Sequence, residues 1–195
     1  KLVFPAGTYK TTSPLTVTSV QGLIIEGAGA PATKIVGSAT MSCVWNLNGF
    51  AISKMSGMMI SGDSTHVVTA GILYHWDSSL SNSSSYNSTF DNIYVEGNTL
   101  LCDNGWSVGT DNTADVSDST WINCRSAGGQ TIGLWSDAKW QYGWKFGTGT
   151  VGNCLNHTMI GCQSLLWANG IGVTGSSNTV VGGNIIQNGV DFYHT

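Results

Sequence analysis

The sequence predicts an all-β protein that winds as a right-handed, single-stranded parallel β-helix, a solenoid of about six turns with projecting loops. Three observations support this prediction. Only 9% of the 195 residues are charged and 26 are glycine, so turn-forming residues replace the Lys and Glu of helical proteins. One motif recurs along most of the chain. Within each copy the apolar residues alternate, as they do along a strand.

The clearest repeat is the segment 105–126, which matches residues 143–164 without a gap. The matched pairs include Gly105/Gly143, Trp106/Trp144, Thr120/Thr158, Cys124/Cys162 and Ser126/Ser164. Looser copies lie at residues 21–27, 56–62, 71–74 with 88–95, and 170–175 with 178–186. Because the motif keeps its length while the spacing between copies varies, the repeat predicts a constant frame with insertions.

Short strands recur at the same position of each repeat and are separated by Gly and Asn turns. Their backbone groups find hydrogen-bond partners most simply when each turn of the chain stacks on the last. The strands then pair in parallel about 4.8 Å apart, and equivalent residues form rows. A β-sandwich is the second expectation. It would need antiparallel hairpins and gives no reason for rows of like residues.

Two alternating series of apolar residues define the expected strands. One is Ile72/Tyr74, Trp106/Val108, Trp144/Phe146, Ile171/Val173 and Val190/Phe192, and the other is Ile122/Cys124, Ile160/Cys162 and Val181/Gly183. A period of two indicates one buried face. The same register places a polar row on the outer face, along which a sugar chain can lie: Tyr94, Arg125, Gln163 and Asn184.

The opening of the chain resembles the pectate-lyase-like β-helix superfamily. The resemblance rests on LVFPAGTY (2–9), SPLTV (13–17), GLIIEGAG (22–29) and TKIV (33–36), and it extends over the remaining residues through the repeat. That superfamily includes phage tailspikes and tail-fibre depolymerases, together with secreted polysaccharide lyases and hydrolases. The resemblance implies a polysaccharide ligand, a homotrimer and a place on the virion tail or outside the cell.

Residues 1–195 are expected to form one β-helix domain. Family members usually carry an N-terminal helical cap ahead of the FPAGTY turn, and the chain ends within another turn. We therefore expect a fragment of a longer protein that lacks its N-terminal cap and its C-terminal part.

Several other function classes are not expected. The net charge is −4 and no basic cluster is present, which argues against nucleic-acid binding. No apolar run approaches the roughly 20 residues of a membrane span. The five cysteines have no metal-binding spacing, so neither a metal nor a cofactor is expected. Cys124 and Cys162 are expected to be small buried hydrophobes, and a disulfide between them is left open.

Four residues are candidates for catalysis. Asp77 and Asp137 end similar phrases, GILYHWD and GLWSD, and a glycosidase needs two carboxylates. The alternative is that each caps an Asx turn. Arg125 is the only arginine, and the resemblance to polysaccharide lyases suggests an arginine base with Glu96 nearby. The alternative is an exposed Arg125–Glu96 ion pair worth about 0–1 kcal/mol.

Aromatic residues are sorted by their place in the repeat. Trp106 and Trp144 occupy positions that Ile fills in other copies, so they are expected in the core. The segment 127–142 is longer than its counterpart and is expected to project. The carbohydrate-binding candidates are Trp135, Trp140 and Tyr142 in that segment, Trp76 beside Asp77, and Tyr94 and Gln163 in the polar row. Packing of the projecting loop onto the coil is the alternative.

The first functional expectation is a phage tailspike or tail-fibre β-helix that binds host cell-surface polysaccharide, with depolymerisation left open. The second is a secreted polysaccharide lyase or glycoside hydrolase. The third is a non-catalytic structural or adhesive β-helix.

Overall fold

The computed structural model describes residues 1–77, 84–97, 102–109, 116–129, 142–147, 154–174, 177–186, 188 and 190–194. Within these ranges every strand pairing is parallel. The protein is therefore all-β and built of parallel sheets, which is compatible with the predicted β-helix. The antiparallel pairing of a β-sandwich does not occur in the described strands.

The strands form three sheets. Sheet A has twelve: β1 (Leu2–Phe4), β2 (Gly7–Thr11), β4 (Ile24–Gly27), β5 (Thr33–Gly37), β7 (Lys54–Gly62), β10 (Thr89–Glu96), β13 (Thr120–Ile122), β14 (Arg125–Ala127), β17 (Thr158–Ile160), β18 (Gln163–Leu165), β20 (Thr179–Val181) and β21 (Asn184–Ile186). Sheet B has seven: β3 (Leu15–Gln21), β6 (Met41–Ala51), β8 (Val68–His75), β11 (Asn104–Val108), β15 (Tyr142–Phe146), β19 (Asn169–Val173) and β22 (Val190–His194). Sheet C has three: β9 (Ser85–Tyr86), β12 (Val116–Ser117) and β16 (Cys154–Leu155).

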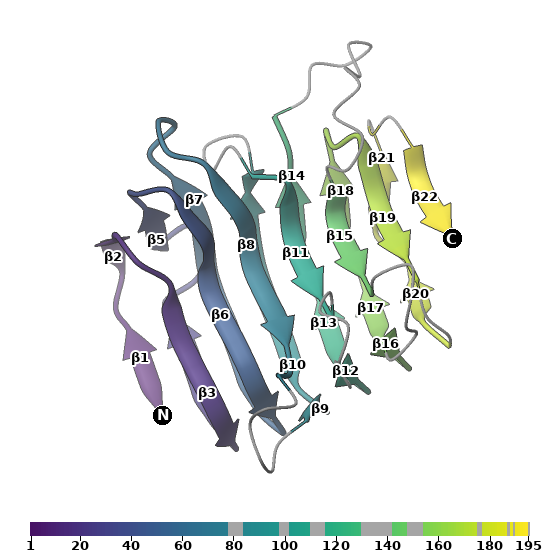
Figure 1. The fold of residues 1–195 in the computed structure, drawn as a ribbon, viewed down its shortest axis with the longest axis horizontal. Helices are drawn as coiled ribbons and strands as arrows, with labels where there is room; N and C mark the ends of the chain where they lie inside the picture. Colours follow the sequence, from purple (N-terminus) through teal and green to yellow (C-terminus); the bar gives the residue numbers. More distant parts are fainter. Residues whose placement is uncertain are drawn as a thin grey trace.

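The chain runs repeatedly from sheet A to sheet B, with a strand of sheet C before the return to sheet A in three passes, and each pass lies beside the previous one. Figure 1 shows the strands of sheet B side by side from β3 to β22, with sheet A behind them. Sheet B contributes one strand to each pass, so its seven described strands exceed the expected count of about six. Neighbouring strands in space are thus equivalent strands of successive passes.

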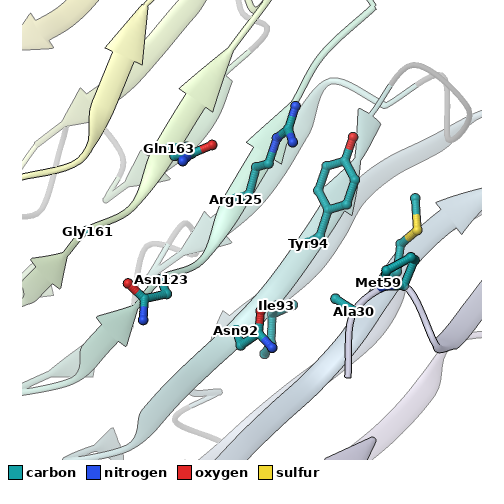
Figure 2. A pocket seen from close by; sticks show the side chains of 10 residues that line it. Ala30, Met59, Asn92, Ile93, Tyr94, Asn123, Arg125, Gly161 and Gln163 are labelled. Carbon is teal, nitrogen blue, oxygen red and sulfur yellow. The ribbon is translucent and has the colours of Figure 1, made fainter. Parts of the chain in front are cut away.

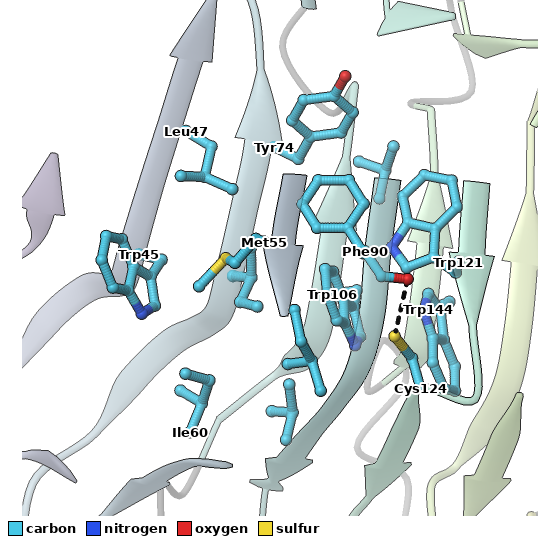
Figure 3. Packing of buried hydrophobic residues seen from close by; sticks show 14 of the residues in the cluster. Trp45, Leu47, Met55, Ile60, Tyr74, Phe90, Trp106, Trp121, Cys124 and Trp144 are labelled. Carbon is cyan, nitrogen blue, oxygen red and sulfur yellow. Dashed lines mark hydrogen bonds between the residues drawn. The ribbon is translucent and has the colours of Figure 1, made fainter. Parts of the chain in front are cut away.

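Aromatic side chains fill the space between sheets A and B. Trp106 pairs in register with Trp144, and their rings stack with centroids 6.4 Å apart and planes 6° apart. From sheet A, Phe90 stacks on Trp121 at 5.2 Å, and Trp121 meets Trp106 edge to face. Figure 3 shows these rings in one cluster. The expectation that Trp106 and Trp144 belong to the core is confirmed, because both are fully buried.

A column of left-handed residues bends sheet A in successive passes from β7 onward. Gly57, Asn92, Asn123, Gly161 and Gly182 share one register position and have φ values of 68°, 51°, 50°, 63° and 64°. Glycine adopts this region freely, and Asn is the side-chain-bearing residue that tolerates it best. The recurring Asn and Gly residues therefore place the bend at the same point of successive passes.

The bend corrects one predicted alternation. Ile160 was expected on the buried face with Cys162, but it is 40% exposed, whereas Met159 and Cys162 are buried. The left-handed residue Gly161 interrupts the period of two, so Met159 and Cys162, three positions apart, both point inward and Ile160 points outward. Ile122 pairs with Ile160 and likewise faces outward from its strand.

The register of the last strand also differs from the prediction. Phe192, not Val190, pairs with Ile171, and Val190 pairs with Asn169. A shift of two residues keeps every side chain on its face. Alternation alone therefore did not distinguish the two registers.

Candidate functional site

A groove with a volume of about 510 Å³ lies on the outer face of sheet A (Figure 2). One side is the row Met59, Tyr94, Arg125 and Gln163, which comes from strands β7, β10, β14 and β18. The groove runs across the strands, so it follows the direction in which the passes stack.

The parallel register explains this row. Tyr94 pairs with Arg125, Arg125 with Gln163, and Gln163 with Asn184. Equivalent residues on neighbouring parallel strands lie about 4.8 Å apart, and their side chains point to the same face. The predicted outer row of Tyr94, Arg125, Gln163 and Asn184 is therefore confirmed as a register row.

The floor of the groove is the left-handed bend. Asn92, Asn123 and Gly161 line it, and both asparagines are exposed. A Cβ atom on Gly161 would lie 2.7 Å from Oδ1 of Asn123, so the glycine keeps the floor open. At one end the groove is closed by Ala30 and Pro31 from the loop after β4.

Arg125 is positioned by an aromatic ring. Its guanidinium carbon lies 4.8 Å from the ring centroid of Tyr94, a cation–π contact worth about 0.5–1 kcal/mol at an exposed site. Burial raises the pKa of the Tyr94 hydroxyl, Arg125 opposes that shift and Glu96 adds to it. Tyr94 is thus a neutral phenol at physiological pH and can donate a hydrogen bond.

The polar side chains of the groove form no hydrogen bond with another residue in the described part of the chain. The amides of Asn92, Asn123 and Gln163 make no side-chain hydrogen bond there, and Arg125 contacts only the Tyr94 ring. Amides and a guanidinium supply several donors and acceptors. The groove therefore presents unpaired hydrogen-bonding groups beside an aromatic ring.

Glu96 lies near this row but has a different partner from the one expected. Its carboxylate forms a salt bridge with Lys34 at 3.7 Å, while Arg125 rests on Tyr94. The anticipated Arg125–Glu96 ion pair is not among the salt bridges of the described residues. Glu96 does not line the groove.

Asp77 and Trp76 belong to another part of the molecule. They follow β8 in sheet B, and the backbone N–H of Asp77 donates to Oδ1 of Asn48 at 2.9 Å. Trp76 is half-buried, and the adjacent His75 contacts Asn46 through Nε2 at 2.8 Å. Neither Asp77 nor Trp76 lines the groove with Arg125.

The expectation that Tyr142 is an exposed aromatic platform is wrong. Tyr142 begins β15 and is 3% exposed. Its ring covers Gly172, where an added Cβ would lie 2.4 Å from Cε1 of the ring, and Nζ of Lys145 lies 5.5 Å from the ring centroid. Asp137, Trp135 and Trp140 lie outside the described residues.

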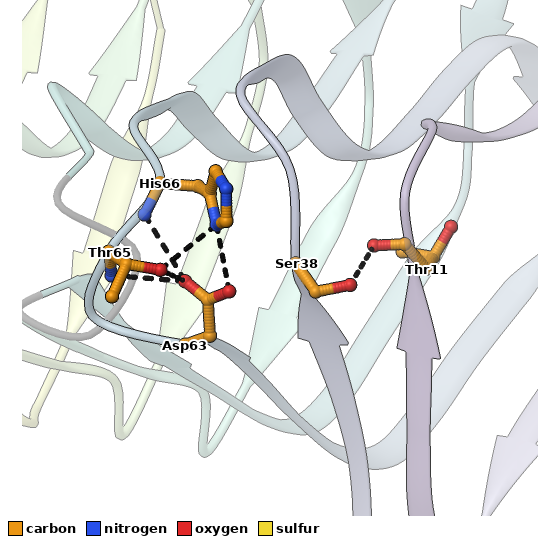
Figure 4. Close-up of polar contacts among 5 residues, drawn as sticks. All are labelled: Thr11, Ser38, Asp63, Thr65 and His66. Atoms are coloured by element: carbon orange, nitrogen blue, oxygen red, sulfur yellow. Dashed lines mark hydrogen bonds and ion pairs between the residues drawn. The ribbon is translucent and has the colours of Figure 1, made fainter.

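A second polar cluster closes the loop between β7 and β8 (Figure 4). Oδ1 of Asp63 accepts hydrogen bonds from the N–H and hydroxyl of Thr65, and Oδ2 contacts Nδ1 of His66 at 2.8 Å. These bonds, those from Thr65 above all, hold the pKa of the Asp63 carboxyl well below its usual range. The contacts are those of an Asx turn, a structural role.

Other site types have no support in the described ranges. Among those residues, no three His, Cys, Asp or Glu side chains gather to form a metal site. No described helix has the length and hydropathy of a membrane span.

Comparison with known proteins adds no assignment. No protein-family model matches the chain, and neither a curated protein nor a solved structure matches it.

Proposed function

We propose that the chain is a right-handed parallel β-helix of the pectate-lyase-like type, and that its groove on sheet A binds an extended polysaccharide. Support for the fold comes from the alternation between sheets A and B and from register rows that continue over successive passes. Parallel strands in one sheet are almost always joined by right-handed crossovers, which favours the right-handed form.

One observation carries the ligand assignment: a row of unpaired polar side chains runs beside a tyrosine ring along the stacking direction. Sugar hydroxyls both donate and accept hydrogen bonds, so they suit the amides of Asn92, Asn123 and Gln163. The faces of sugar rings suit the apolar part of Tyr94. A polysaccharide repeats its hydroxyl groups along one direction, and the groove repeats its polar side chains along one direction, so the two match.

The opening motif of the chain supports a more specific proposal about the source of the ligand and the location of the protein. It resembles that of phage tailspike and tail-fibre proteins, so the proposed ligand is a host cell-surface polysaccharide and the proposed location is the virion tail. A homotrimer is part of the same proposal. The alternation of sheets and the polar groove are in keeping with such a protein.

The residues that line the groove favour binding of a polysaccharide over its cleavage. No carboxylate lines it in the described part of the chain. Hydrolysis of a glycosidic bond generally requires two carboxyl groups, about 5–9.5 Å apart. Depolymerisation through Asp77 and Asp137, or through Arg125 and Glu96, stays a hypothesis.

The proposal is tested by incubating the purified protein with a panel of immobilised bacterial surface polysaccharides and measuring retention. Retention on at least one polysaccharide, lost in Arg125→Ala, is expected. Retention by no member of the panel, or equal retention of wild type and variant, would contradict the assignment. Viscometry on the same polysaccharides separates binding from cleavage, with Asp77→Asn and Asp137→Asn as the variants that a hydrolase should not tolerate.

A further inference from the structure

Two buried cysteines occupy the same position in successive passes of the chain. Their flanking residues pair in register, Ile122 with Ile160 and Arg125 with Gln163. The backbone N–H of Gln163 donates to the carbonyl of Cys124 at 2.9 Å. Neighbouring parallel strands are about 4.8 Å apart, and disulfides bridge Cα atoms separated by about 4.4–6.8 Å. The backbone spacing at Cys124 and Cys162 therefore suits a disulfide.

The two thiols lean in the same direction. Sγ of Cys162 contacts the carbonyl of Trp121, one pass earlier, at 3.5 Å, and Sγ of Cys124 makes the equivalent contact with Phe90 at 3.5 Å (Figure 3). Trp121 is in the same pass as Cys124. The sulfur of Cys162 is thus directed toward the pass that contains Cys124.

Both thiols are buried, and they differ in what lies beyond them. Cys124 is fully buried, and Cys162 is 3% exposed. In the next pass, the position equivalent to Cys162 is Gly183, which has no side chain to cover the sulfur. Two of the other cysteines have different register neighbours, since Cys43 pairs with Ala70 and Cys154 with Val116.

We propose that Cys124 and Cys162 are a latent disulfide, which joins two successive passes of the β-structure when the protein meets a hydroperoxide. All five cysteines are free in the structure, which is therefore the reduced form of the pair. This inference does not rest on the polysaccharide proposal, because it uses only the register of the strands and the position of the thiols.

The chemistry needs one equivalent of hydroperoxide. Burial raises the pKa of the Cys124 thiol, and Cys162 is the less completely buried of the two, so Cys162 is the thiol that reacts first. Its thiolate attacks one peroxide oxygen, the O–O bond breaks, and hydroxide leaves and is protonated to water. The sulfur of Cys124 then attacks the resulting sulfenic sulfur, giving the S–S bond and a second water. Two thiols and one hydrogen peroxide thus yield one disulfide and two waters.

The physical consequence is a cross-link that appears only outside a reducing compartment. The cytosol keeps thiols reduced, and extracellular surroundings do not. Folding would proceed without a covalent constraint. The disulfide would then restrict the unfolded chain over the loop between the two cysteines.

The test uses the folded, reduced protein treated with hydrogen peroxide under native conditions, followed by intact mass measurement and peptide mapping. The expected result is the loss of two hydrogen atoms, a Cys124–Cys162 peptide pair, and a rise in Tm of about 5 °C or more that dithiothreitol reverses. Cys154→Ser is the matched control and should form the cross-link. Cys162→Ser should not.

Three outcomes would overturn the proposal: no loss of hydrogen at any peroxide concentration, addition of oxygen to Cys162 without a bridge, or a bridge that maps to another cysteine. Because the mapping is done on the wild-type protein, the proposal stays testable if Cys162→Ser fails to fold.

Discussion

The guanidinium of Arg125 lies over the ring of Tyr94, with its central carbon 4.8 Å from the ring centroid. The two residues come from neighbouring strands and share one register position. The ring restricts the guanidinium while its N–H groups stay available on the groove side. This relationship defines the proposed site, because it joins an aromatic surface to a fixed set of donors.

Removing the guanidinium should weaken polysaccharide binding. A hydrogen bond to a charged group contributes about 1.5–3 kcal/mol, so Arg125→Ala is expected to raise the Kd at least about tenfold by calorimetry. Lys54→Ala is the matched control. Lys54 is another cation on sheet A, but it pairs with Asp91 and lies outside the groove. A Kd that changes equally in both variants would mean that only net charge matters.

The phenol ring and its hydroxyl can be tested separately. Tyr94→Phe keeps the ring under Arg125 and should change the Kd by less than about fivefold, whereas Tyr94→Ala should act like Arg125→Ala. If the two Tyr94 variants bind equally well, the ring has no role in positioning the ligand or the arginine.

Acid should destabilise the protein through His157. Nδ1 of His157 accepts a hydrogen bond from the N–H of Ser119 at 3.3 Å, and burial lowers the pKa of His157 to about 4. The unfolded chain has a histidine pKa of about 6.5 and binds a proton more readily. The contribution of His157 to the unfolding free energy is therefore fully present above about pH 6.5. It is lost as the pH falls through about 4, and the loss is at most roughly 3 kcal/mol.

The measurement is urea denaturation at a series of pH values between about 7 and 4. His157→Asn is the informative variant, because Asn178 fills the equivalent position in the next pass and accepts from the N–H of His157 at 3.0 Å. Its stability should depend less on pH than that of the wild type. An equally steep dependence in the variant would assign the acid sensitivity to other groups.

Substitution of Gly161 and Gly182 should separate backbone strain from side-chain contact. Both have a left-handed backbone, with φ of 63° and 64°. A Cβ on Gly161 meets Asn123, and a Cβ on Gly182 meets nothing within 4 Å. Alanine at either position is expected to cost about 1–2 kcal/mol in unfolding free energy. Only Gly161→Ala should also weaken polysaccharide binding, and a loss of binding in Gly182→Ala would contradict the position of the groove.

Much of the fold was predictable because equivalent residues repeat. The match of residues 105–126 with 143–164 predicted that Trp106 pairs with Trp144, and the structure confirms this. The row of Tyr94, Arg125 and Gln163 followed from the same register. Where the chain repeats itself closely, the sequence therefore also predicts which residues are neighbours in space.

The structure differs from the prediction in two situations. In one, the alternation of buried and exposed residues is interrupted; in the other, the position of a side chain depends on residues far away in the sequence. The left-handed bend at Gly161 turned Ile160 outward, although a continuous strand would bury it. Tyr142 was assigned to a projecting loop because the segment 127–142 is longer than its counterpart in the repeat, but it begins β15 and is buried. The groove brings Pro31 to the same surface as Gln163, and no local pattern connects two residues so far apart in the chain.

A row of buried and half-buried polar residues could not be recognised from the sequence repeat. Ser88, Ser119, His157 and Asn178 occupy one position in successive passes, and each accepts a backbone N–H from the pass before. These side chains differ in size and chemistry, so they do not read as a repeat. What they share is an acceptor atom, which takes the hydrogen bond of a buried backbone N–H in a turn.

The most direct measurement is a crystal structure of the protein with an oligosaccharide from the tightest-binding polysaccharide. The proposed function predicts that sugar rings lie along the groove, in contact with Tyr94, Arg125 and Gln163, with the chain of sugars running across the strands of sheet A. An oligosaccharide bound elsewhere, such as beside Trp76 and Asp77 at the end of β8, would contradict the proposed site.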